Sequence, residues 1–102
     1  KETFMVLFLN AQNHLLCFDV IPGTVDRATV YAREVLEKAI NTKATAVILA
    51  HNHPTGICEP SPADIRLTNT IRQVLQPVGI LLHDHIIVAP SCHFSFASRR
   101  LL

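Results

Sequence analysis

The stretch ATAVILAHNHPTGICEPSPAD, residues 44–64, predicts the centre of the fold. Its first part, residues 44–50, is a short continuous apolar run, which is typical of a strand covered on both faces. Its last part, residues 61–64, has a serine suited to an N-cap, a proline suited to the first helical position and an acid at the third. The stretch therefore predicts a strand, a loop containing proline and glycine, and a helix, with His51 and His53 at the strand end.

The segments on either side predict a mixed sheet with helices packed on it. Apolar runs rich in β-forming residues predict strands, and apolar residues at helical spacing predict a helix before and after the central strand. The predicted elements are strands at 3–10, 15–21, 44–50, 80–89 and 93–98 and helices at 29–42 and 61–76. The order ββαβαββ indicates an α/β layered domain.

Length and composition indicate one globular domain. The chain has 102 residues, of which 49% are apolar and 17% charged, so we assign residues 1–102 to a single domain with a packed core. No apolar run approaches the roughly 20 residues of a membrane helix, so no membrane association is expected. The net charge of +1 provides no strong basic field, and we expect no strong nucleic-acid binding by this domain alone.

The three cysteines, Cys17, Cys58 and Cys92, are scattered and odd in number. Their spacing indicates neither a disulfide framework nor a CxxC pair, which favours a reducing, cytoplasmic setting. Cys58 lies between the histidine pair and Ser61. It is a candidate for an extra thiolate ligand or for oxidative regulation, and an ordinary loop residue is the simpler interpretation.

His51 and His53 have the spacing of a metal-binding pair. Residues i and i+2 of a strand point to one side of the sheet, and the end of such a strand is where open α/β sheets hold ligands. The loop can return the chain so that Asp64, in the first helical turn, faces both imidazoles. Two imidazoles and one carboxylate suit Zn²⁺, and three protein ligands leave one position open, as in catalytic zinc sites.

A hydrolytic zinc site also needs a proton acceptor for water. Spacing leaves three candidates open: Glu2 at the start of the first strand, Glu59 in the loop and Asp84 on a late strand. Ser61 has two interpretations as well. It is a good N-cap, and beside the histidines it can take part in the chemistry.

His83 and His85 are expected to share one face of a late strand, with Asp84 on the other. A second metal site is one interpretation of this pair. Buried hydrogen bonds of Asp84 or His85 that order the sheet near the first site are the favoured one.

The histidine pair, seven intervening residues and S-x-x-D together resemble the motif of the JAMM (JAB1/MPN) metalloproteases. The flanking sequence is similar to the bacterial RadC branch of that family. ILAHNHPTG and EPSPAD resemble its central block, FMVLFLNAQNHLL resembles its opening hairpin, and DHIIV and SFA resemble its end. The resemblance covers essentially the whole chain.

The resemblance implies a cytidine-deaminase-like, three-layer α/β/α fold with bound zinc. It implies that His51, His53 and Asp64 are the metal ligands, that Glu2 is the base that activates water, and that Ser61 donates a hydrogen bond to the oxyanion. Relatives that act on proteins cleave peptide or isopeptide bonds, so a protein or peptide substrate is expected.

The sequence departs from the family pattern at Thr55, where serine is usual, at Tyr31-Ala32, where His-Pro is usual, and at Arg100, where glycine is common. None of these is an implied ligand. The N-terminal helix-hairpin-helix segment of many full-length relatives is absent from this sequence, which weakens any inference of DNA binding. A homo-oligomer is compatible with the sequence.

Other classes of function compete with the hydrolase. A zinc nucleobase deaminase needs H-x-E and P-C-x-x-C, whereas His53 stands in place of that glutamate and Cys58 has no partner at the required spacing. A metal-free scaffold should lack the ligands, and here the set is complete. The main alternative is a RadC-type, DNA-repair-associated accessory or binding domain with little or no peptidase activity.

Overall fold

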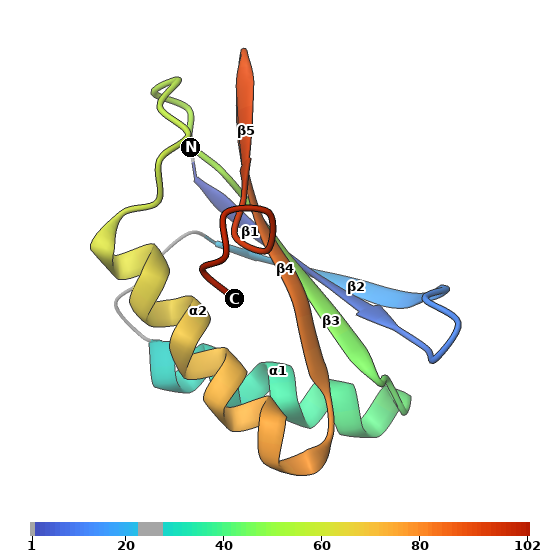
Figure 1. Ribbon diagram of the computed structural model, residues 1–102. Helices are drawn as coiled ribbons and strands as arrows, with labels where there is room; N and C mark the ends of the chain where they lie inside the picture. The colour runs from blue at the N-terminus through green and yellow to red at the C-terminus, as the bar shows by residue number, and fades with distance from the viewer. Residues whose placement is uncertain (1, 23–27) are drawn as a thin grey trace.

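The computed structural model describes residues 2–22 and 28–102, and five strands and two α-helices lie in this part of the chain (Figure 1). In chain order they are β1 (Thr3–Leu9), β2 (Leu15–Pro22), α1 (Ala28–Thr42), β3 (Ala46–Asn52), α2 (Pro62–Leu75), the short 3-10 helix η2 (Gln76–Val78), β4 (Leu81–Ala89) and β5 (Cys92–Ser95). The predicted order ββαβαββ is confirmed.

The strands form one mixed sheet in the order β2-β1-β3-β4-β5. β1 runs antiparallel to both β2 and β3, β3 and β4 run parallel, and β4 and β5 form an antiparallel hairpin. The connection between the parallel strands contains the loop after His53 and the helix α2. The predicted mixed sheet is therefore confirmed, and the ends of β3 and β4 meet at one edge of it.

Both helices pack on the same face of the sheet and contact each other (Figure 1). The core between them and the sheet is built from side chains of β1, β3 and both helices. Its members include Phe4, Val6, Phe8, Val35, Ala39, Val47, Leu49, Leu67, Ile71 and Leu75. The α/β fold class is confirmed. The described residues form two layers, and the second helical layer that the resemblance implies is not among them.

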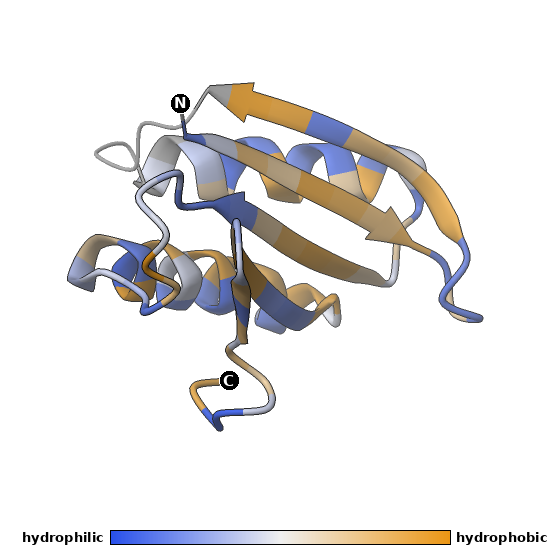
Figure 2. Cartoon of the chain, turned by 90° about the horizontal axis from the view of Figure 1, so that it is seen from above, coloured by the Kyte–Doolittle hydropathy of each residue, from blue (hydrophilic) through white to orange (hydrophobic). Residues whose placement is uncertain are grey.

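The helices are amphipathic, as Figure 2 shows by the alternation of hydrophilic and hydrophobic segments along them. In α2 the apolar residues Leu67, Ile71 and Leu75 recur at helical spacing and are buried. The opposite side of the sheet carries exposed apolar residues such as Phe18 and Val20. Among the described residues, neither helix has the length and apolar character needed to cross a bilayer.

Cys58 and Cys92 form a disulfide, with their Cα atoms 6.2 Å apart. The prediction that the cysteines are unpaired is therefore wrong for these two, and only Cys17 is a free thiol. Spacing could not reveal the pair, because it depends on the loop after β3 lying beside the turn between β4 and β5. The disulfide also removes the cysteine-based argument for a reducing compartment.

Candidate metal centre

The histidine pair lies at the end of β3. His51 is the sixth residue of the strand and is 2% exposed, and His53 follows the strand and is half-buried. Their ring centroids are 4.6 Å apart, and one ring presents its edge to the other. The backbone N–H of His53 donates to the carbonyl of Val88 at 2.8 Å, which fastens this point to β4. The two imidazoles therefore meet on one side of the sheet, as alternation predicts.

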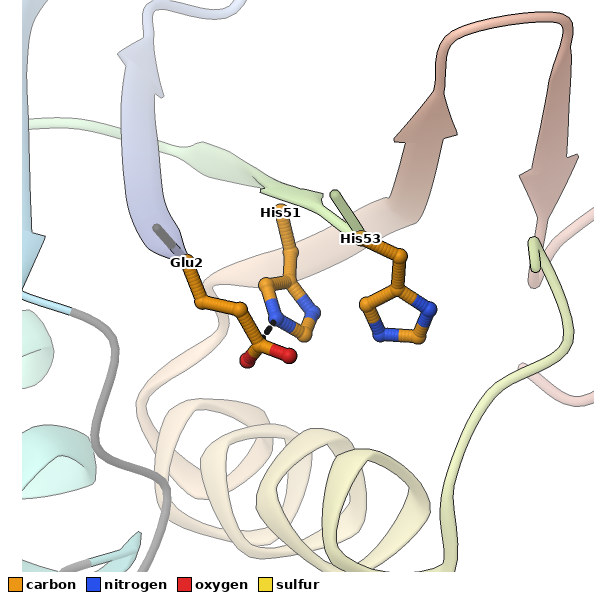
Figure 3. A group of neighbouring side chains, drawn as sticks. All are labelled: Glu2, His51 and His53. Carbon is orange, nitrogen blue, oxygen red and sulfur yellow. Dashed lines mark hydrogen bonds and ion pairs between the residues drawn. The ribbon is translucent and has the colours of Figure 1, made fainter. Parts of the chain in front are cut away.

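Glu2 reaches the pair from the neighbouring strand. β1 and β3 are antiparallel with Phe4 opposite His51, so the start of β1 lies beside the end of β3. The backbone N–H of Thr3 donates to Oδ1 of Asn52 at 2.6 Å and ties the two strands together there. His51 Nε2 lies 3.0 Å from Glu2 Oε1 (Figure 3).

Asp64 approaches the pair from the first turn of α2 and is 1% exposed. Its Oδ2 lies 3.1 Å from His53 Nε2, and its Oδ1 lies 3.5 Å from His51 Nδ1. Figure 1 shows that the loop after β3 carries the chain back to the start of α2. The structure therefore brings together three predicted ligands, His51, His53 and Asp64, from a strand end and a helix start.

The hydrogen bonds of His53 fix its tautomer. Its Nδ1 lies 2.8 Å from the carbonyl oxygen of Ile57, which can only accept, so Nδ1 carries the proton. In the neutral ring, Nε2 is then a bare acceptor, and it faces the Asp64 carboxylate, also an acceptor, at 3.1 Å. This contact is favourable when a proton or a metal cation lies between the two groups.

The same argument applies to His51. Its Nε2 donates to the carboxylate of Glu2, which leaves Nδ1 as a bare acceptor in the neutral ring. Among the described residues, this buried Nδ1 has no hydrogen-bond partner. A buried polar atom without a partner is costly, and here it is directed at the second oxygen of Asp64. The donor set thus fits a cation bound by two nitrogens and a carboxylate, which is the chemistry of zinc sites.

A second combination of ligands is also close enough for one ion. Glu2, His51 and His53 offer one ligand atom each within 4.8 Å of one another. Glu2 is the more exposed acid, with 45% of its side chain accessible against 2% for Asp64. The structure therefore gathers two carboxylates around the histidines, one solvated and one buried.

Ser61 caps α2 as the sequence predicts. Its Oγ accepts from the backbone N–H of Asp64 at 3.0 Å, and its own N–H donates to Asp64 Oδ2 at 2.9 Å. This reciprocal capping box fixes the Asp64 carboxylate beside His53. The Ser61 hydroxyl hydrogen is used in neither bond, so the capping role leaves it available as a donor.

Two aromatic residues and a threonine support the site. Phe4 stacks on His51 with ring centroids 4.1 Å apart. Thr68 Oγ1 donates to the Asp64 carbonyl at 2.8 Å and lies 2.5 Å from His85 Nδ1, so His85 donates to it. Phe96 stacks on the ring of His85, with ring centroids 4.6 Å apart.

Burial, followed by the charge of nearby His51, lowers the pKa of His85 from 6.5 to about 4, so His85 is neutral near pH 7.

The remaining candidates lie elsewhere. The carboxylate of Asp84 accepts from Ser95 Oγ at 2.6 Å and from the backbone N–H of Ala97 at 2.9 Å, so it orders the end of the sheet. Glu59 is exposed in the loop. His83 lies at a register shift in β4 and bonds to the loop between β1 and β2, whereas His85 is buried against α2. The two imidazoles of that strand do not share a site.

Sequence reasoning missed the supporting groups. Phe4 could have been found from the register, because it is the direct partner of His51 on β1. Thr68 also had a signal, since it lies one helical turn after Asp64. The Ile57 carbonyl had none, because a backbone acceptor carries no side-chain pattern.

The fold and this site define an α/β domain with a candidate metal centre at the edge where β3 ends. Residues 1–101 match the family described as RadC-like JAB domain. The chain belongs to this RadC-like JAB domain family.

Curated relatives agree with this assignment. The chain is 50% identical to a UPF0758 protein of Pseudoalteromonas translucida (strain TAC 125) over 103 aligned residues, which cover 100% of the chain and 46% of the relative. It is 47% identical to a UPF0758 protein of Marinomonas sp. (strain MWYL1), with the same coverage. A third, from Methylibium petroleiphilum, is 47% identical over 99% of the chain and 46% of its own length. The chain thus spans about half the length of these relatives.

Proposed function

We propose that this domain is a zinc-dependent hydrolase that cleaves an amide bond, either peptide or isopeptide, in a protein or peptide substrate. The observation that carries the proposal is that hydrogen-bond acceptors face one another at the end of β3, with no donor between them. Two imidazole lone pairs, on His51 Nδ1 and His53 Nε2, face one buried carboxylate, Asp64. Membership of a family that resembles the JAMM metalloproteases supports the same chemistry.

In this proposal His51, His53 and Asp64 hold the ion. A bound zinc ion would supply Lewis acidity and bring the pKa of a water molecule near neutrality. The chain's own contribution is orientation: the Ile57 carbonyl fixes the His53 ring, and the capping box with Ser61 fixes the Asp64 carboxylate. Hydrogen bonds from a ligand side chain to neighbouring groups that do not themselves touch the metal set both the tautomer and the direction of that ligand.

Glu2 is assigned the role of general base. Its carboxylate is next to the histidines but remains 45% exposed, so it can exchange a proton with solvent between turnovers. The other two candidates are less well placed, since Asp84 is engaged with Ser95 and Ala97 and Glu59 is exposed in the loop. Ser61 is assigned as the donor to the oxyanion, through the hydroxyl hydrogen that the cap does not use.

The test is metal analysis followed by hydrolysis. Protein purified without chelator and reconstituted with zinc should contain about one zinc per chain, and His51→Ala should contain none. The loaded protein should then cleave members of a panel of fluorogenic peptide and isopeptide substrates. No zinc in the reconstituted wild type would overturn the metal site. One zinc without cleavage of any panel member would favour the accessory-domain alternative.

A further inference from the structure

The disulfide between Cys58 and Cys92 lies next to the candidate metal centre. Cys58 belongs to the loop that joins His53 to Ser61, and Cys92 is the first residue of β5. The bond therefore ties the loop that sets the ligand geometry to the β4–β5 hairpin. Cys92 Sγ also lies 3.6 Å from the carbonyl of Gly56, on the same loop.

The residue before Cys58 supplies the contact that orients His53. The carbonyl of Ile57 accepts the Nδ1–H of His53 at 2.8 Å and so leaves Nε2 directed at Asp64. The position of this carbonyl depends on the loop, and the loop has little packing of its own. None of residues 54–60 is buried, and Ile57 is 62% exposed.

We propose that the Cys58–Cys92 disulfide is a redox-sensitive clasp that sets the metal affinity of the site. In the oxidised protein the clasp holds the Ile57 carbonyl against His53, and the ring presents Nε2 to the ion. In the reduced protein the loop loses this tether, the bond to Nδ1 is made only part of the time, and the metal is bound more weakly. The inference rests on the proposed metal site and adds a regulator to it.

The chemistry of opening is a two-electron thiol–disulfide exchange. A thiolate of a dithiol reductant attacks one sulfur of the disulfide, the second thiol of the reductant resolves the mixed disulfide, and Cys58 and Cys92 leave as two thiols. The reductant is oxidised to its own disulfide. Cys92 is exposed and Cys58 is half-buried, so the bond is accessible to such a partner.

The expected size of the effect follows from the contact that is lost. Removal of the group that accepts the other ring N–H of a metal-binding histidine typically lowers metal affinity by about 10- to 100-fold. We therefore expect zinc to bind oxidised protein about 10- to 100-fold more tightly than reduced protein. A cell compartment rich in dithiols would weaken the site, and an oxidising one would strengthen it.

The experiment compares zinc affinity in three proteins by competition with a chromophoric chelator. These are oxidised wild type, the double variant Cys58→Ser/Cys92→Ser, and Cys17→Ser. The last is the matched control, because it removes the free cysteine of β2 and leaves the clasp intact. The double variant should lose about 10- to 100-fold in affinity, and Cys17→Ser should match the wild type.

Wild type reduced by a dithiol, freed of reductant and kept anaerobic, provides the same comparison if the double variant does not fold.

A second readout, the tautomer of His53, needs no metal. In the apo protein, imidazole nitrogen chemical shifts should show His53 with its proton on Nδ1 when oxidised, and a mixture of tautomers when reduced.

Equal or tighter zinc binding by the reduced protein would overturn the clasp. Tighter binding would instead indicate that a freed thiolate of Cys58 or Cys92 becomes a ligand. Absence of zinc binding in both redox states would overturn the proposed function. In that case the His53 tautomer of the apo protein is the remaining test of whether the clasp orients the ring. A tautomer that is the same in the oxidised and reduced proteins would overturn the clasp too.

Discussion

The carboxylate of Glu2 lies 3.0 Å from Nε2 of His51, although 49 residues separate them in the sequence. The antiparallel pairing of β1 with β3 places Phe4 opposite His51, so the start of one strand meets the end of the other. The hydrogen bond from the Thr3 N–H to the Asn52 side chain holds the two strands together at this point. The first residues of the described chain therefore belong to the candidate metal centre.

The first prediction separates two roles for Glu2. Glu2→Gln should retain about one zinc per chain, because a base is not a ligand, and should lower hydrolysis by about 10²- to 10⁴-fold. Elemental analysis and turnover of a panel substrate measure the two effects. Glu59→Gln, an exposed acid in the loop, is the matched control and should change neither. Loss of zinc from Glu2→Gln would make Glu2 a ligand, as its closeness to both histidines allows.

The second prediction concerns the buried carboxylate. Asp64→Asn keeps the shape of the side chain and an oxygen that can accept the Ser61 N–H, so α2 should remain capped. It removes the negative charge that two imidazole nitrogens face. We expect zinc affinity to fall by at least about 10-fold with a small change in melting temperature. Unchanged zinc affinity in Asp64→Asn would show that the ion is held without this carboxylate.

The third prediction divides the capping role of Ser61 from its role in chemistry. Ser61→Ala should lower the free energy of unfolding by about 1 kcal/mol, because the bond to the Asp64 N–H is lost. Ser61→Asn should restore the cap and the stability. If the hydroxyl donates to the oxyanion, Ser61→Asn should still lose about 10²-fold or more in hydrolysis. Full activity of Ser61→Asn would reduce Ser61 to a helix cap.

Much of the site could be predicted because local patterns determine it. The apolar run before His51 indicates the strand, and S-P-A-D indicates the helix start, so the two elements that carry the proposed ligands were predictable from short-range signals. The meeting of Glu2 with His51 required one further step, the antiparallel pairing of the first strand with the central one, and the structure has that pairing.

The rest depends on contacts between segments that no local pattern connects. The disulfide joins cysteines 34 residues apart, and its formation depends on where a loop and a hairpin happen to meet. The register shift within β4 gives His83 and His85 different surroundings, although strict alternation would place them alike. The arrangement of both helices on one face is likewise a property of packing between elements rather than of any one element.

The fourth prediction concerns the end of α1. Lys43 has φ +61°, a left-handed conformation that suits glycine, and its N–H donates to the carbonyl of Ile40. The next N–H, of Ala44, donates to Ala39, which completes the helix end. Lys43→Gly should therefore raise the free energy of unfolding by about 1 kcal/mol, since a left-handed L-residue costs roughly 1–2 kcal/mol. Lys43→Ala, which keeps a Cβ, is the control for loss of the charge and should give no such gain in denaturant unfolding.

The last prediction uses the buried imidazole of His85. Its folded pKa of about 4 lies below the ordinary value of 6.5, chiefly because burial disfavours the charged ring. At pH values between about 4 and 6.5, His85 binds a proton in the unfolded chain but not in the folded protein. The contribution of neutral, buried His85 to stability is therefore complete above about pH 6.5 and is lost as the pH falls toward about 4.

His85→Phe removes this titration while keeping a ring against Phe96. With chelator present to keep the site free of metal, the free energy of unfolding should fall more steeply for wild type than for His85→Phe across that window. The difference should total roughly 3 kcal/mol, since one pKa unit corresponds to about 1.36 kcal/mol. His83→Phe, on the same strand but bonded to Asn13 near the surface, should follow the wild-type curve. Parallel curves for wild type and His85→Phe would mean that His85 titrates normally in the folded protein, and that water reaches the layer behind the candidate metal centre.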